Sequence, residues 1–172
     1  MPNGGLQFAS VSSDDALPYA ILSHTWADGQ EVTYSELVAG AGKDKTGFAR
    51  IRFRSERAAA DGLEYCRVDT CCIDKSLSRA INSMFHWYQR ASKCYVYLSD
   101  VSVPGESSDA EGLPLAWQEA FRSSRWLTRG WTLQELLAPV SVEFCCKQDK
   151  RLVSSCRWSK RSMGSLGSRS QP

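Results

Sequence analysis

Four runs of apolar residues along the chain have the length and composition of buried β-strands. Residues 19–23 (YAILS) are almost continuously apolar, and residues 65–73 (YCRVDTCCI) and 94–100 (CYVYLSD) are rich in β-branched, aromatic and cysteine side chains. Residues 140–146 (VSVEFCC) alternate more clearly between apolar and polar positions. Continuous apolar strands are typical of a parallel sheet that is covered on both faces.

The segments between these runs carry the periodicity of helices. The clearest is 77–91, which repeats apolar side chains at i, i+3, i+4 and i+7 as a helix packed on a core does. Similar patterns predict helices over 48–63, which is more basic, over 115–126, and over 132–138, which Pro139 ends. Alternating strands and helices predict an α/β layered fold with a parallel central sheet flanked by helices.

Composition divides the chain into three regions. An irregular lead of residues 1–18 precedes the patterned part, which we expect to form one domain over 19–146. The remaining 147–172 form a basic tail rich in Ser and Arg, which has no clean period and is expected to be disordered or truncated. At 172 residues the chain is long enough to bury one sizeable core.

The net charge of +2 is distributed unevenly. The tail holds seven of the 21 Lys and Arg and one of the 19 acids, which leaves 14 basic and 18 acidic residues in 1–146. A mildly acidic body argues against a nucleic-acid partner, which usually binds a basic face. No apolar stretch approaches the roughly 20 residues of a membrane-spanning helix, and the first ten residues do not resemble a signal peptide. These features predict a cytoplasmic protein without a membrane partner.

The seven cysteines leave three interpretations open. Cys71 and Cys72 with His24 or His86 could hold zinc, but structural zinc sites favour Cys pairs separated by two to four residues. Neighbours in a strand also point to opposite faces, so no metal site is expected. His24 and one of these two cysteines could form a nucleophile pair. Packing of free cysteines in the core is the commoner outcome.

Polar residues gather at the carboxyl ends of the predicted strands, which share one edge of the sheet. They are Ser23, His24, Trp26, Asp69, Asp74 and Asp100. Ligands of open parallel sheets bind at this edge, so we expect a binding crevice there. Glu135 begins the last helix, shortly before the fourth strand, and would face the same crevice. The alternative is that these residues only cap turns.

Four blocks of sequence resemble a known family. They are YAILSHTW, VDTCCIDK, AINSMFHWYQRASKCYVYLSDV and SRWLTRGWTLQELLAP. Their order and their span, from residue 19 to about 146, resemble the heterokaryon incompatibility (HET) domain of filamentous fungi. The resemblance implies a role in non-self recognition after cell fusion and in programmed cell death. It also implies an upstream sensor protein as a partner.

The HET domain is regarded as a distant relative of Toll/interleukin-1 receptor (TIR) domains, some of which hydrolyse NAD. The resemblance therefore implies a TIR/flavodoxin-like architecture. Many plant TIR domains carry S-x-W-C-x-x-E-L after their third strand, and the glutamate is catalytic. This chain reads WTLQEL over 131–136, also after its third predicted strand. The match carries over Glu135 alone, as the catalytic carboxylate of an NAD glycohydrolase for which NAD is substrate rather than cofactor.

Under this hypothesis, Glu135 stabilises the oxocarbenium-like state formed when the nicotinamide–ribose bond breaks. The other polar residues at the sheet edge would bind the substrate. The set comprises His24, Asp69 and Asp100 for the ribose hydroxyls, Trp26 or Trp131 for stacking, Arg125 or Arg129 for the diphosphate, and Ser23 and Asp74 nearby.

Other interpretations require no chemistry. Thr132-x-x-Glu135 fits a capping box, in which Glu135 reaches back to a backbone N–H and contributes about 1 kcal/mol. The chain would then be a non-enzymatic interaction module that self-associates through helix faces, or an inert truncated fragment.

Overall fold

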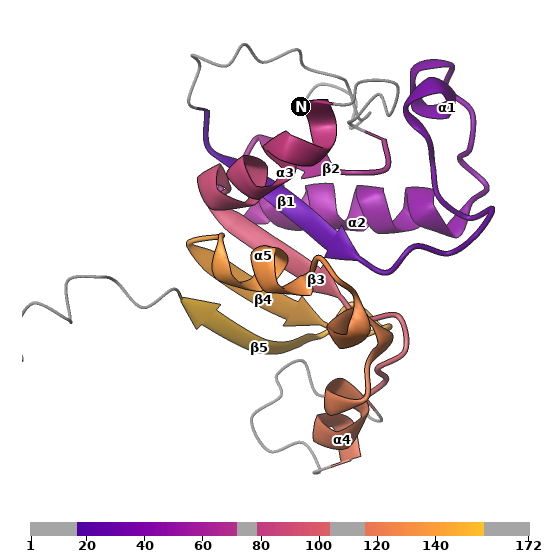
Figure 1. The fold of residues 1–172 in the computed structure, drawn as a ribbon. Coiled ribbons are helices and arrows are strands. Elements are labelled where there is room, and N and C mark those ends of the chain that lie inside the picture. The colour runs from indigo at the N-terminus through magenta and orange to yellow at the C-terminus, as the bar shows by residue number, and fades with distance from the viewer. Residues whose placement is uncertain (1–16, 72–78, 104–115, 157–172) are drawn as a thin grey trace, which may run out of the picture.

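A five-stranded sheet with the order β2-β1-β3-β4-β5 forms the centre of the molecule (Figure 1). The structure is a computed structural model and describes residues 17–71, 79–103 and 116–156. The strands are β1 (Tyr19–His24), β2 (Tyr65–Val68), β3 (Lys93–Tyr97), β4 (Ser141–Cys145) and β5 (Arg151–Cys156). The first four are parallel, and β5 is antiparallel to β4. The predicted α/β layered fold with a mainly parallel sheet is therefore confirmed.

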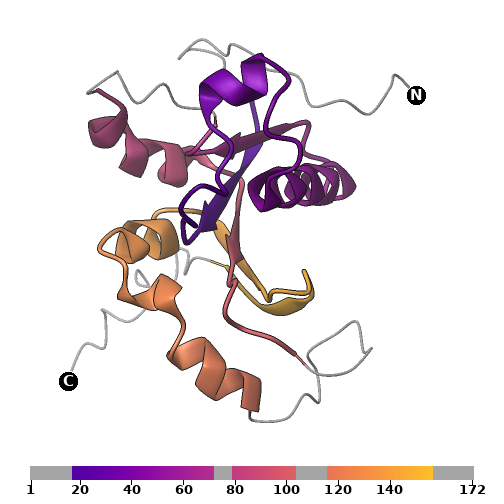
Figure 2. The same ribbon diagram turned by 90° about the vertical axis from the view of Figure 1, so that its right-hand side faces the viewer.

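Helices cover both faces of the sheet. Figure 2 shows the sheet between α2 (Thr46–Ala60) on one side and α3 (Arg79–Arg90) and α5 (Thr132–Leu137) on the other. Along the chain, the short α1 (Tyr34–Val38) comes before α2. Likewise α4 (Ala116–Arg122) and the 3-10 helix η1 (Arg125–Thr128) come before α5. This strand order is that of flavodoxin-like doubly wound sheets, apart from the antiparallel β5. The likeness to TIR domains stays a prediction.

Side chains of β1 alternate between two hydrophobic cores, because successive residues of a strand point to opposite faces. Ala20 and Leu22 pack in the core beneath α2, together with Ile51 of that helix. Ile21 packs in the larger core beneath α3 and η1, together with Trp126. Every residue of the strand after the partly buried Tyr19 is buried, which explains why residues 19–23 read as an almost continuous apolar run.

Most predicted elements are found within a few residues of their expected ends, and two differ. The helix expected over 115–126 is interrupted, because Ser124 accepts a hydrogen bond from the Trp126 backbone N–H and begins η1. The second strand ends at Val68, and residues 72–73 of its predicted range lie outside the described residues. The short α1 was not predicted.

The expectation that the chain lacks regular structure after residue 146 is wrong for β5. A tight turn returns the chain, with hydrogen bonds from Cys146 N to Lys150 O at 3.0 Å and from Asp149 N to Cys146 O at 2.9 Å. Asp149 has a φ of 60°, a left-handed conformation that Asp tolerates better than most residues. β5 then satisfies the backbone groups of the β4 edge, a stabilisation that its own weak apolar pattern does not reveal.

Candidate functional site

Glu135 lies buried between α5 and the carboxyl end of β1. Its Oε2 accepts hydrogen bonds from Ser23 Oγ at 2.7 Å and from Arg129 Nη1 at 2.9 Å, and its Oε1 accepts from Arg129 Nη2 at 3.2 Å. Ser23 Oγ itself accepts from Trp126 Nε1 at 2.7 Å. The resulting network, Trp126–Ser23–Glu135–Arg129, connects η1 and α5 to β1.

The capping-box interpretation of Glu135 is wrong. Trp131, not Thr132, is the N-cap of α5, and it makes no side-chain capping bond. The Thr132 hydroxyl instead donates to the Trp126 carbonyl at 2.5 Å. A buried carboxylate requires a charged or hydrogen-bonding partner inside the protein, and Arg129 and Ser23 fill that role.

His24 belongs to a second network on the other face of the sheet. Its Nε2 lies 2.9 Å from Glu31 Oε2, while Glu31 Oε1 accepts from Ala27 N at 3.0 Å and from Arg50 Nη2 at 2.9 Å. Burial alone would raise the pKa of Glu31, but the hydrogen bonds from His24 and Ala27 and the charge of Arg50 lower it to about 2. Two neighbouring residues, Ser23 and His24, therefore serve two separate networks.

A pocket of about 620 Å³ opens where β1 and β3 end. The strand order reverses at this point, because β2 lies on one side of β1 and β3 on the other. Open α/β sheets bind their ligands at such a switch point. We call this pocket the crevice; its aromatic and charged lining residues are Trp26, Asp28, Arg50, Tyr97, Arg125, Lys147 and Asp149.

Arg54 is completely buried and reaches one of the crevice residues. Its Nη2 donates to Asp149 Oδ1 at 3.0 Å, and its guanidinium lies 5.3 Å from the centre of the Tyr97 ring. Arg50, one helical turn earlier on α2, lies 5.7 Å from the same ring. Burial raises the pKa of Asp149, and the nearby arginines partly offset this effect. On its α2 side the crevice is therefore lined by Arg50, while the buried Arg54 holds Asp149 in place.

The structure brings some of the predicted site residues together and separates others. Ser23 and Arg129 contact Glu135 directly, as described above. Trp26 lines the crevice, and its Nε1 donates to Asp69 Oδ2 at 3.2 Å. Neither Glu135 nor His24 is among the residues that line the crevice.

The remaining predicted residues have other surroundings. Asp100 accepts hydrogen bonds from Ser124 Oγ at 2.8 Å and from Arg125 N at 2.7 Å, so it holds the start of η1. Trp131 is exposed at the N-terminus of α5. Asp74 lies outside the described residues. The expected convergence of all these side chains on one ligand is therefore not seen.

Sequence reasoning missed several residues of this edge. Arg50 and Arg54 lie one helical turn apart in α2, and that spacing could have indicated basic side chains facing the sheet. Lys147 and Asp149 were assigned to the tail, which removed them from consideration. Glu31 lies in an irregular segment and carries no periodic signal.

The cysteine chemistry considered from the sequence gains no support. Among the described residues, no group of three His, Cys, Asp or Glu side chains could hold a metal ion. Cys71, one of the two candidate nucleophiles, is buried, and burial raises the pKa of two other thiols, those of Cys94 and Cys145, which disfavours their reactive thiolates. Cys72 lies outside the described residues.

In the part of the chain that the structure describes, no helix has the length and apolar character needed to cross a membrane.

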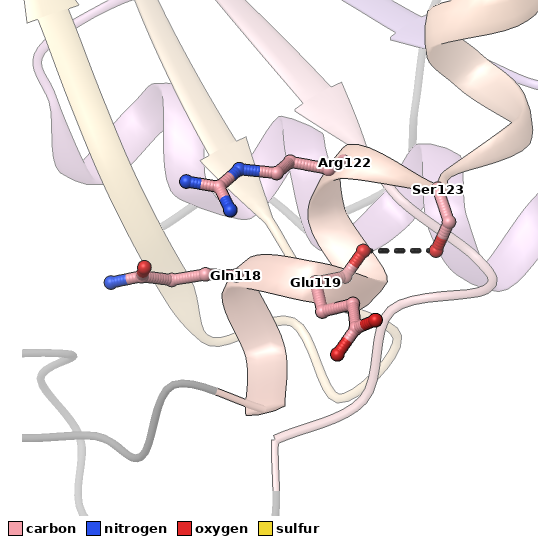
Figure 3. Close-up of a pocket in the computed structure, with 4 residues that line it drawn as sticks. All are labelled: Gln118, Glu119, Arg122 and Ser123. Atoms are coloured by element: carbon pink, nitrogen blue, oxygen red, sulfur yellow. Dashed lines mark hydrogen bonds between the residues drawn. The ribbon is translucent and has the colours of Figure 1, made fainter.

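A second hollow of about 590 Å³ lies along α4 (Figure 3). Its lining residues are Gln118, Glu119, Arg122 and Ser123, which come from α4 and the residue that follows it. Ser123 Oγ donates to the Glu119 carbonyl at 2.9 Å, as the dashed line shows. No predicted site residue lines this hollow, so the crevice is the better candidate.

The chain is 54% identical over 140 residues to the vegetative incompatibility protein HET-E-1 of Podospora anserina. The match covers 78% of this chain, which spans about a tenth of the length of that relative. No protein-family model and no solved structure matches the chain. With this identity over most of its length, and with its four motif blocks in the family's order, the chain belongs to the heterokaryon incompatibility (HET) domain family.

Proposed function

We propose that the chain acts in heterokaryon incompatibility and programmed cell death by binding NAD in the crevice and hydrolysing it. The name of the relative from Podospora anserina supports the role in incompatibility. The observation that carries the ligand is the crevice itself, which combines an exposed indole with three cationic side chains at the switch point of the sheet.

The crevice offers the groups that a dinucleotide requires. Arg50, Arg125 and Lys147 provide positive charge for the diphosphate, and arginine can bind two phosphate oxygens at once. Trp26 provides an aromatic face for the adenine or nicotinamide ring. Asp28 and the other acid of the crevice provide acceptors for ribose hydroxyls. A volume of about 620 Å³ lies in the range of small-molecule sites.

Hydrolysis by Glu135 requires a rearrangement of its surroundings. The carboxylate is enclosed by Arg129 and Ser23, and Ser23 faces the core opposite to the crevice wall formed by α2. Departure of Arg129 would free a charged carboxylate to stabilise the oxocarbenium-like state. If the pair does not open, Glu135 serves only to hold α5 on β1 and no turnover follows.

The test measures NAD binding by calorimetry and nicotinamide release by chromatography on the purified chain. Arg125→Ala combined with Lys147→Ala removes two crevice cations. The matched control, Lys43→Ala combined with Arg52→Ala, removes two exposed cations that do not line the crevice. We expect the first pair to weaken NAD binding at least about tenfold, since each lost phosphate contact involves a charge-assisted hydrogen bond, and the control pair to leave it unchanged.

Glu135→Gln separates binding from hydrolysis. We expect it to bind NAD and to release no nicotinamide, with its fold verified by circular dichroism and a cooperative melt. Equal turnover by wild type and Glu135→Gln would remove Glu135 from the mechanism. If the wild type binds NAD but releases no nicotinamide, the chain recognises NAD without hydrolysing it. Absence of NAD binding by a folded wild-type chain would overturn the proposal and favour an interaction module.

A further inference from the structure

Arg54 is a fully buried cation that leaves much of its hydrogen-bonding capacity unused. Its Nη2 donates to Asp149 Oδ1 at 3.0 Å, but among the described residues its Nε and Nη1 find no acceptor. The neighbouring Cys145 thiol is only a weak acceptor. Buried N–H groups without an acceptor are unfavourable, above all on a charged group. Arg54 would therefore gain from an anion that offers more oxygens than the single one that Asp149 supplies.

Asp149 separates Arg54 from the crevice. Asp149 lines the crevice and its side chain is 28% exposed, whereas Arg54 is not among the lining residues. The two are joined by one hydrogen bond and not by the bidentate pair that arginine and a carboxylate often form. A rotation of the partly exposed Asp149 side chain would open Arg54 to the crevice.

Other cations surround the position of the Asp149 carboxylate. Arg50 lies one helical turn before Arg54, and the two guanidinium groups lie 5.7 Å and 5.3 Å from the centre of the same Tyr97 ring. One terminal nitrogen of Arg50 is paired with an acid, while its buried Nε has no acceptor among the described residues. Lys147, two residues before Asp149, lines the crevice as well. An anion at this position would therefore meet several cations at once.

We propose that the phosphate oxygens of the crevice ligand bind Arg54 by displacing the Asp149 carboxylate, which holds Arg54 until the ligand arrives. This inference rests on the proposed function, because it concerns the same crevice and assigns the diphosphate of the dinucleotide to an anion site behind Asp149. A diphosphate carries more negative charge and more acceptor oxygens than a carboxylate, and the planar fork of arginine can bind two of these oxygens together.

The surroundings of Asp149 make its displacement inexpensive. Burial raises the pKa of Asp149, and the nearby arginines offset this effect only in part. The charged carboxylate is therefore less stable beside Arg54 than in water, and it regains hydration when it turns towards solvent. Once released it remains on the turn beside the crevice, where it can accept a hydrogen bond from a ribose hydroxyl.

Calorimetry with inorganic diphosphate, on the full 172-residue chain, provides the test. This probe carries no ribose or base, so contacts to those groups do not enter the result. Asp149→Asn removes the competing charge and keeps a residue type that tolerates the φ of 60° at this position. Asp28→Asn is the matched control, because it removes one negative charge from the same crevice.

We expect Asp149→Asn to bind diphosphate at least about tenfold more tightly than the wild type, because Arg54 becomes available for charge-assisted hydrogen bonds. The control should change the affinity by no more than about twofold, since Asp28 is exposed and its charge is screened.

A second variant asks whether the gain comes from Arg54. Arg54→Met combined with Asp149→Asn removes both partners and leaves no unpaired charge, and it should bind no more tightly than the wild type. Circular dichroism and a cooperative melt verify the fold of each variant. In the wild type, the NMR resonance of the Arg54 Nε–H should shift as diphosphate is added, and this measurement does not depend on the folding of a variant.

Three results would overturn the inference. They are equal gains for Asp149→Asn and Asp28→Asn, a gain that survives the loss of Arg54, and no diphosphate binding by folded wild type and Asp149→Asn. The proposed function fails separately. Diphosphate binding as expected without NAD binding would keep the anion site and remove the dinucleotide, whereas NAD binding with equal gains for the two acid variants would keep the dinucleotide and remove the anion site.

Discussion

Ser23 and Glu135 are 112 residues apart in the chain, and Ser23 Oγ donates to the Glu135 carboxylate at 2.7 Å. The bond joins the first strand to the last helix in a buried environment. Arg129 supplies the charge that the carboxylate needs there. The consequence for stability is large, because a buried charge that loses its partner is strongly unfavourable.

Arg129→Met should lower the free energy of unfolding by about 3 kcal/mol, because it leaves the carboxylate of Glu135 buried without a cation. Replacing both residues, as Arg129→Met with Glu135→Met, should recover most of that loss, since no charge then remains. Urea unfolding at neutral pH measures both. A single variant within about 0.5 kcal/mol of wild type would show that solvent reaches the pair.

Ser23→Ala should cost about 1–3 kcal/mol, because it leaves Trp126 Nε1 without its acceptor and removes one of the two hydrogen bonds that Glu135 Oε2 accepts. Trp126→Phe removes the donor and leaves Ser23 bonded to Glu135. A double-mutant cycle over Ser23 and Trp126 should therefore give a coupling of about 1 kcal/mol. Additive effects of the two changes would contradict the hydrogen bond between them.

Glu31 should make the stability of the protein sensitive to acid. Burial would raise its pKa, but the hydrogen bond from His24 and its other partners hold the pKa at about 2, below the ordinary value of 4.5. The stabilisation is therefore complete above about pH 4.5 and is lost as the pH falls towards 2. After allowance for solvent screening it amounts to about 1–2 kcal/mol.

Urea unfolding at a series of pH values, for wild type and Glu31→Gln, measures this contribution. The variant should lose less stability than wild type between pH 4.5 and 2. Glu56→Gln, at an exposed position of α2, is the control and should follow the wild-type profile. Parallel profiles for all three proteins would contradict the assignment to Glu31.

Gly47→Ala should destabilise the protein by about 1–3 kcal/mol, although alanine is the better helix former. A Cβ at this position would lie 2.5 Å from the Gln30 carbonyl oxygen, because the start of α2 packs directly on the preceding loop. Gly130→Ala is the control, since its Cβ would meet no atom within 4 Å. Thermal melts of the two variants should differ clearly, and equal melting temperatures would disprove the close packing at Gln30.

The strands and long helices could be predicted because their patterns are local. The apolar run at 19–23 lies within β1, and the described part of the helical stripe at 77–91 lies mostly within α3, so tertiary contacts only confirm them. β5 could not be predicted in this way. β5 is stabilised by backbone hydrogen bonds to the edge of β4. The sequence pattern of residues 151–156 does not indicate these backbone bonds.

The candidate site was predictable in position and not in detail. The carboxyl edge of the sheet follows from strand order, and Trp26 does line the crevice there. The pairing of Ser23 with Glu135 depends on where α5 lies relative to β1, and spacing within WTLQEL does not contain that information. The same spacing indicated a capping box, which fails because Thr132 bonds to the Trp126 carbonyl instead.

The alternation of β1 makes its length more important than most of its individual side chains. Substitution of Ser23 or His24 removes a partner from one network and leaves the other in place. Deletion of one residue of β1 before Ser23 would turn every later residue of the strand to the opposite face of the sheet. His24 would then face Trp126, and Ser23 would face Glu31. Variation among functional relatives should therefore include changes of residue type in β1, and no insertions or deletions.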